Sequence, residues 1–247
     1  MDIVTLGLLA SLLAGLATGF GALPILITKN VSERLLDVML GFSAGVMLAA
    51  TSFSLIIPAL EIGGVFVGIF GLTLGALTVH LIDRFIPHAH LISGFEGPST
   101  RLSRVWLFII AMTIHNFPEG IAVGVSFGIG DSSSGMAVAL AIGLQNMPEG
   151  LAVAMPLIRE KYSRVRALWY ATLTGLVEPV GGLLGVILVS ASHAFLPWGL
   201  SFAAGAMLFV VSDEMIPESH RREFAREATL GLISGFILMM FLDTIFG

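Results

Sequence analysis

Apolar residues occupy most of the chain in long runs separated by short polar stretches. Eight runs are long enough to cross the hydrocarbon core of a bilayer, which takes about 20 residues in a helix. Because lipid cannot satisfy backbone polar groups, each run is predicted to be an α-helix. The predicted helices cover residues 3–27, 36–59, 63–85, 105–127, 135–158, 167–191, 199–218 and 228–246. The pattern predicts an all-α polytopic membrane protein whose whole length, 1–247, forms one transmembrane domain.

The basic residues predict the orientation of these helices. All 12 Lys and Arg residues lie in alternate connections, beginning with the one between the first and second helices. Positive charge in short loops stays on the cytoplasmic side of a membrane. Both termini are therefore predicted to be extracytoplasmic, and the long connection at 86–104 to be cytoplasmic. We expect a multi-pass membrane protein.

Composition narrows the classes of function. The chain is 56% hydrophobic and 12% charged, about half the charged share of a typical soluble domain. It contains no cysteine, which excludes disulfides and thiolate metal sites. The absence of a Gly-rich phosphate-binding loop argues against ATP as a driving force within this chain. We expect no prosthetic group and no nucleic-acid partner.

An internal repeat links the second and seventh predicted helices. Residues 42–48 (Phe-Ser-Ala-Gly-Val-Met-Leu) match residues 202–208 (Phe-Ala-Ala-Gly-Ala-Met-Leu). The charge rule makes these two helices run in opposite directions. The first three and last three helices are therefore predicted to be inverted repeats around the hairpin of the fourth and fifth, a 3+2+3 arrangement. Inverted repeats are typical of transporters whose binding site lies near the midplane.

A second repeat places polar residues inside the fourth and fifth helices. Residues 115–120 are His-Asn-Phe-Pro-Glu-Gly, and residues 145–150 are Gln-Asn-Met-Pro-Glu-Gly. An ionisable group at bilayer depth costs several kcal/mol, so its default interpretation is functional. Each proline also frees a backbone carbonyl one turn earlier. In lipid, such a carbonyl needs protein, water or an ion as its partner.

The spacing brings the polar side chains of both hexads to one level. Residues four apart share a helix face, so His115 lies over Glu119, and Gln145 lies over Glu149. The two helices are antiparallel neighbours, which puts His115 level with Glu149 and Glu119 level with Gln145. One imidazole, two carboxylates and one amide oxygen would then converge near the midplane. Such a set of ligands suits a divalent cation.

Three further residues extend this candidate site. Glu178 lies about eleven residues into the sixth helix and could add a third carboxylate. Asn116 and Asn146 are neighbours of the hexad ligands and could hold a second metal ion bridged by the two hexad glutamates. The structural alternative is that these polar groups pair with one another and only join helices, as Asn and Gln often do in membranes.

Other polar residues lie near the cytoplasmic ends of helices. Asp213 and Glu214 in the seventh helix could pass metal to the cytoplasm, or they could be a solvated helix end. His88 and His90 lie in the 86–104 connection and could hold a metal transiently, although two solvated loop histidines are the simpler explanation.

The paired hexads resemble the signature of the ZIP (Zrt-, Irt-like protein) family of divalent-metal transporters, particularly its prokaryotic GufA-like branch. The resemblance covers essentially the whole chain. It implies import of Zn²⁺, and often of Fe²⁺, Mn²⁺ or Cd²⁺, into the cytoplasm as substrate. It also implies a homodimer and an elevator-like motion of helices 1, 4, 5 and 6 against helices 2, 3, 7 and 8.

When the family's motif is matched residue by residue to this sequence, the resemblance implies a main transport site and a second site. The main site comprises His115, Glu119, Gln145 and Glu149. The second site comprises Asn116, Asn146 and Glu178 with the bridging glutamates. Other family members have His in place of Gln145 and Asp in place of Asn146, so the neutral amides bear on selectivity.

Two other classes of function remain open from the residues alone. An intramembrane metalloenzyme is one, although the chain lacks His-Glu-x-x-His and has only six His in total. A proton-coupled carrier of an organic solute, with the three buried glutamates as proton relays, is the other. We expect a transporter and not an enzyme.

Overall fold

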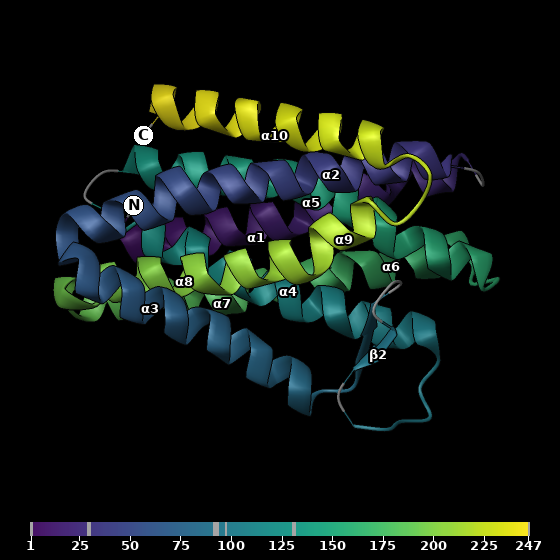
Figure 1. Cartoon of the computed structure of the whole chain (residues 1–247), viewed down its shortest axis with the longest axis horizontal. Coiled ribbons are helices and arrows are strands. Elements are labelled where there is room, and N and C mark those ends of the chain that lie inside the picture. Colours follow the sequence, from purple (N-terminus) through teal and green to yellow (C-terminus); the bar gives the residue numbers. More distant parts are fainter. Residues whose placement is uncertain (1, 29–30, 91–93, 97, 130–131, 247) are drawn as a thin grey trace.

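The computed structural model describes residues 2–28, 31–90, 94–96, 98–129 and 132–246. Within them, seven helical stretches are long and apolar enough to cross a membrane. In chain order the elements are α1 (Ile3–Ala22), η1 (Leu23–Leu26), α2 (Glu33–Ala49), η2 (Ala50–Ile56), α3 (Ile57–Phe85), β1 (His88–His90), β2 (Gly94–Glu96), α4 (Arg104–Ser126), α5 (Ser132–Arg159), α6 (Arg164–Gly175), α7 (Glu178–Ala191), η3 (His193–Phe195), α8 (Leu196–Val210), η4 (Val211–Met215), α9 (Ile216–Ser219) and α10 (Ala225–Phe246). The long helices run side by side along the molecule (Figure 1), as predicted for a polytopic membrane protein.

The structure differs from eight separate helices between Glu33 and Phe85. These residues form one helical stretch of 53 residues, more than twice the length that one crossing needs. Gly64 interrupts it with φ 75° and ψ 173°, a backbone conformation open mainly to glycine. In Figure 1 the chain that continues from α2 turns back in the first part of α3, near the end of the bundle where α1 begins. Hydropathy alone could not show that the two runs join without a loop.

The predicted sixth helix, 167–191, is in fact two shorter helices. α6 ends at Gly175, and α7 begins at Glu178 with Pro179 in its first turn. Proline has no amide hydrogen to donate to a carbonyl four residues earlier, so the helix breaks here. The break puts Glu178 at the amino end of a helix, where the positive end of the helix dipole favours a carboxylate.

Two π-helical segments, η2 and η4, follow α2 and α8 respectively. They occupy corresponding positions in the repeat of residues 42–48 and 202–208. A π-helical turn contains an extra residue, and such turns often occur at functional sites. The seventh predicted helix, 199–218, is therefore a composite of α8, η4 and α9.

The connection at 86–104 contains a short hairpin that the sequence analysis did not predict. β1 and β2 pair antiparallel, with Ala89 opposite Phe95. Each strand has three residues, and an isolated two-stranded hairpin is only marginally stable.

Four helix pairs form the principal packing contacts: α2 with α10, α3 with α8, α1 with α5, and α4 with α7. Glycines allow the backbones to approach. A Cβ on Gly45 would lie 1.9 Å from the Leu232 carbonyl oxygen, and one on Gly205 would lie 1.9 Å from that of Leu72. Gly205 lies 160 positions after Gly45, and Leu72 lies 160 positions before Leu232. The sequence repeat therefore extends to matching helix contacts.

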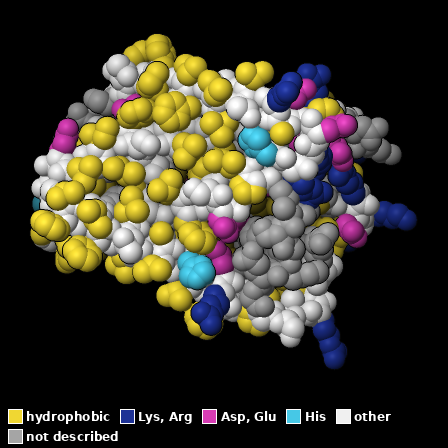
Figure 2. Space-filling view, in the orientation of Figure 1, with side chains coloured by type: hydrophobic (Ala, Val, Ile, Leu, Met, Phe, Trp, Pro, Cys, Tyr) yellow, Lys and Arg dark blue, Asp and Glu magenta, His cyan; other side chains and the backbone are white. Residues whose placement is uncertain are grey.

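The surface has a broad apolar face and one basic end. On α10 the buried residues Ala228, Gly231, Gly235 and Met239 form one stripe, and large apolar side chains such as Phe241 are exposed. This is the pattern of a helix that faces lipid on its outer side. Figure 2 shows apolar side chains over most of the visible face and Lys and Arg toward one end. The start of α1 and the end of α10 lie at the other end (Figure 1).

Candidate metal centre

The two hexads lie in the neighbouring helices α4 and α5, and their polar side chains are buried. The Gln145 Nε2 amide donates to Glu119 Oε1 at 2.6 Å. This contact is the one expected from antiparallel helices with Gln145 and Glu119 at the same level. Carboxylates can only accept hydrogen bonds, so the amide must turn its NH₂ group toward Glu119.

Glu178 joins this cluster from the first residue of α7. It is fully buried, and its Oε1 accepts a hydrogen bond of 2.6 Å from Asn146 Nδ2. The same nitrogen donates to the Ala14 carbonyl of α1 at 2.8 Å. Helices α1, α5 and α7 therefore meet at Asn146, and the structure brings Glu178 to the hexads as the sequence analysis expected.

The second hexad carboxylate, Glu149, has a partner that the sequence analysis missed. The Ser43 hydroxyl of α2 donates to Glu149 Oε1 at 2.6 Å, and both residues are buried. A serine in an apolar helix is an ordinary packing residue, so its type gave no signal. The sequence distinguishes Ser43 only through the internal repeat, because the corresponding residue there is Ala203.

His115 faces Glu214. Its Nε2 lies 2.5 Å from Glu214 Oε2, and both side chains are buried. Glu214, in η4, therefore lies beside the hexads and not at a solvated helix end, because the α8–η4 segment packs against α4. Asp213 is exposed. The side chains of His88 and His90 lie outside the described part of the structure.

Several polar atoms of the cluster have no hydrogen-bond partner among the residues that the structure describes. They include amide oxygens of Asn116, Gln145 and Asn146, and the second carboxylate oxygens of Glu119 and Glu178. Buried polar atoms are usually paired, so each such atom calls for an explanation. These oxygens are hard donors suited to divalent cations. Within the described residues, no three His, Asp or Glu side chains already converge as a metal-binding group. A cation would therefore draw on the amide oxygens or rearrange the paired carboxylates.

A cavity of about 230 Å³ extends from the buried pair of His115 and Glu214 to the basic end of the molecule. Its lining includes His115, Glu214, Glu218, Arg159, Arg221 and Arg222. The cavity connects a buried imidazole and carboxylate with side chains that reach solvent.

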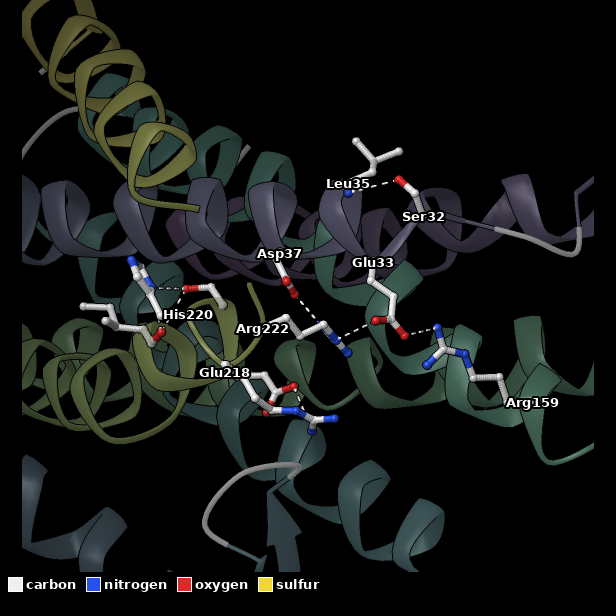
Figure 3. Close-up of polar contacts among 11 residues, drawn as sticks. Ser32, Glu33, Leu35, Asp37, Arg159, Glu218, His220 and Arg222 are labelled. Atoms are coloured by element: carbon white, nitrogen blue, oxygen red, sulfur yellow. Dashed lines mark hydrogen bonds and ion pairs between the residues drawn. The ribbon is translucent and has the colours of Figure 1, made fainter. Parts of the chain in front are cut away.

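Ion pairs join several helices around the mouth of this cavity (Figure 3). Arg222 binds Asp37, and its Nε lies 3.4 Å from Glu33 Oε2. Arg159, at the end of α5, lies 3.2 Å from the other oxygen of Glu33. Glu218 pairs with Arg221 at 3.7 Å. The arginines at the mouth are thus matched by carboxylates.

Comparisons with known proteins agree with this arrangement. A sequence model of the family described as "ZIP Zinc transporter" matches residues 93–243. The "Zinc transporter GufA" of Myxococcus xanthus is 49% identical over 98% of this chain and 99% of its own length. The "Zinc transporter ZIPB" of Bordetella bronchiseptica is 47% identical over 94% of this chain and 78% of its own length. Human "Zinc transporter ZIP11" is 34% identical over 92% of this chain. The chain belongs to the ZIP family, on its prokaryotic GufA-like branch.

Proposed function

We propose that this protein carries divalent cations, Zn²⁺ first among them, across a bacterial inner membrane and into the cytoplasm. The observation that carries the proposal is the buried polar cluster of the hexads, in which Gln145 contacts Glu119 and Asn146 contacts Glu178. Buried His115 of the first hexad lines a cavity that leads to the basic end. An imidazole with carboxylates and no thiolate suits a cation that must also be released. ZIP proteins are transporters, so the chain is not an enzyme.

The proposed substrate site is binuclear. His115, Glu119, Gln145 and Glu149 hold the first ion, and Asn116, Asn146 and Glu178 hold the second, with the two hexad glutamates as bridges. The buried amide oxygens support this assignment because they add neutral ligands between the carboxylates. Neutral ligands limit the repulsion that three carboxylates would otherwise exert on one another.

The proposed topology has eight passes in a 3+2+3 arrangement, with Gly64 at the turn between the second and third. The corresponding glycine contacts of Gly45 and Gly205 support inverted repeats. Basic residues stay in the cytoplasm, so we place the cavity mouth there and both termini outside. Cations would then leave through the cavity.

We further propose elevator-like movement within a homodimer, as the family resemblance implies. The moving part would comprise α1 and α4–α7, and the fixed part α2, α3 and α8–α10. The packing pairs support this division, because α1–α5 and α4–α7 fall in the first part, and α2–α10 and α3–α8 fall in the second.

Uptake of Zn²⁺ into liposomes that contain the purified protein tests this proposal. His115→Ala and Glu149→Ala should each lower the flux at least tenfold, because each removes a ligand. Ser126→Ala is the matched control, since Ser126 is buried and its hydroxyl donates to the Ala122 carbonyl of its own helix. Undiminished flux in both ligand variants would reject the site. If the protein carried an organic solute instead, Zn²⁺ would leave the thermal stability of the purified protein unchanged.

A further inference from the structure

Ser43 is a buried serine whose hydroxyl contacts a carboxylate of the hexads. Among the other buried serines, Ser54 donates to Asp243 Oδ1 of α10 at 2.6 Å, while Ser11 and Ser126 donate to carbonyls of their own helices, at Gly7 (2.8 Å) and Ala122 (2.7 Å). Ser43 instead donates across the helix boundary to Glu149 Oε1 at 2.6 Å. Hydrogen bonds to charged acceptors are shorter and stronger than neutral ones.

Each of the three clustered glutamates accepts at Oε1 from one neutral donor. Gln145 donates to Glu119 and Asn146 donates to Glu178, both at 2.6 Å. Those two donors belong to the second hexad. Glu149 alone among the three is held by α2, which lies outside the helices that carry the hexads and Glu178.

The internal repeat makes this contact asymmetric. Ser43 corresponds to Ala203, a buried residue of α8 that has no hydroxyl. Glu149 corresponds to Glu119 in the first hexad. The repeat therefore offers a hydroxyl from the flanking helix to only one of the two hexad carboxylates, and the two bridging glutamates are chemically unequal.

We propose that Ser43 is a positioning residue that sets which cation the site prefers; this inference rests on the proposed function. By holding Oε1 of Glu149, the hydroxyl fixes the carboxylate and leaves Oε2 as the single oxygen through which Glu149 would bind and bridge the cations. A carboxylate that offers one oxygen suits Zn²⁺, which takes four ligands in a tetrahedron. Larger cations accept more oxygens and bind carboxylates through both. Ser43 therefore favours Zn²⁺ over the larger Cd²⁺.

The test is the ratio of kcat/KM for Zn²⁺ to that for Cd²⁺, measured with Ser43→Ala in proteoliposomes. Loss of the hydroxyl frees the carboxylate to rotate and to bind through both oxygens. We expect the ratio to fall about fivefold and the KM for Zn²⁺ to rise, given the usual strength of a hydrogen bond to a charged group. The ratio is independent of the amount of folded protein, because both ions are measured on one sample.

Two variants control this experiment. Ser43→Thr retains a hydroxyl and should restore much of the ratio, and Ser126→Ala should leave it at the wild-type value. If Ser43→Ala keeps the wild-type ratio, with or without a lower overall rate, Ser43 has only a structural role and the inference is wrong. Failure of the wild-type protein to carry either ion would instead reject the proposed function itself.

Discussion

Gly120 of α4 is the place where a single methyl group should disturb the candidate site most directly. A Cβ at this position would lie 2.1 Å from the Glu178 carbonyl oxygen, so Gly120→Ala requires α4 and α7 to separate by about 1 Å to restore van der Waals contact. Such a shift would stretch the 2.6 Å bond between Asn146 and Glu178 to the limit of a hydrogen bond. Overpacking of this kind lowers the free energy of unfolding by about 1–3 kcal/mol. The higher helix propensity of alanine offsets about 1 kcal/mol of that loss.

Gly143→Ala is the matched control for this substitution. Gly143 lies in α5, and its Cβ would meet the Ala14 Cα at 3.7 Å, an ordinary contact. Gly143→Ala should therefore leave stability unchanged or raise it slightly, while Gly120→Ala should lower the thermal unfolding midpoint by several degrees. Because displacement of a binding group by 1 Å is expensive, we expect Gly120→Ala to lower Zn²⁺ flux about tenfold. If the two variants unfold at the same temperature and carry Zn²⁺ equally fast, the close approach at Gly120 does not position Glu178.

Three further predictions concern residues around the site. Glu214→Gln should slow Zn²⁺ flux because Glu214 lines the cavity beside the hexads, while Asp213→Asn should not; equal effects in the flux assay would remove Glu214 from the exit path. Gln145→His should change the order in which Zn²⁺, Cd²⁺ and Fe²⁺ compete for uptake, since it exchanges an amide oxygen for an imidazole nitrogen; an unchanged order would exclude Gln145 from selectivity. Asp37→Ala should lower the free energy of unfolding by about 1–3 kcal/mol, because it removes the buried partner of Arg222; an unchanged melting curve would contradict this.

The sequence predicted the parts of the fold that depend on hydropathy and helix geometry. Apolar runs located the helices, and the four-residue spacing with antiparallel pairing predicted that Gln145 and Glu119 meet. These features follow from local periodicity and from the requirement that lipid-exposed backbone be helical.

The features that the sequence analysis missed depend on packing between distant segments. The contact of Ser43 with Glu149 spans 106 positions, and nothing in a serine distinguishes a donor to a carboxylate from a donor to its own helix. Glu214 was placed by its distance from a helix end, but η4 and the packing of α8 on α4 bring it to His115. The reversal of the chain within α3 depends on one glycine, Gly64, whose positive φ cannot be recognised from hydropathy.

The amide side chains of the second hexad can contact either a carboxylate or a cation, and a carrier of cations needs both kinds of contact. A site of three carboxylates is stable when a cation fills it, but a carrier also has to return empty through the same apolar interior. An unpaired carboxylate there is costly. Gln145 and Asn146 can serve both conditions, because an amide has an NH₂ group for a carboxylate and an oxygen for a cation. In this structure the NH₂ groups face Glu119 and Glu178. A histidine at 145 would add a stronger Zn²⁺ ligand, but a neutral imidazole has only one N–H to donate. In the proposed carrier, the amide would therefore favour return of the empty site over tight binding of the cation.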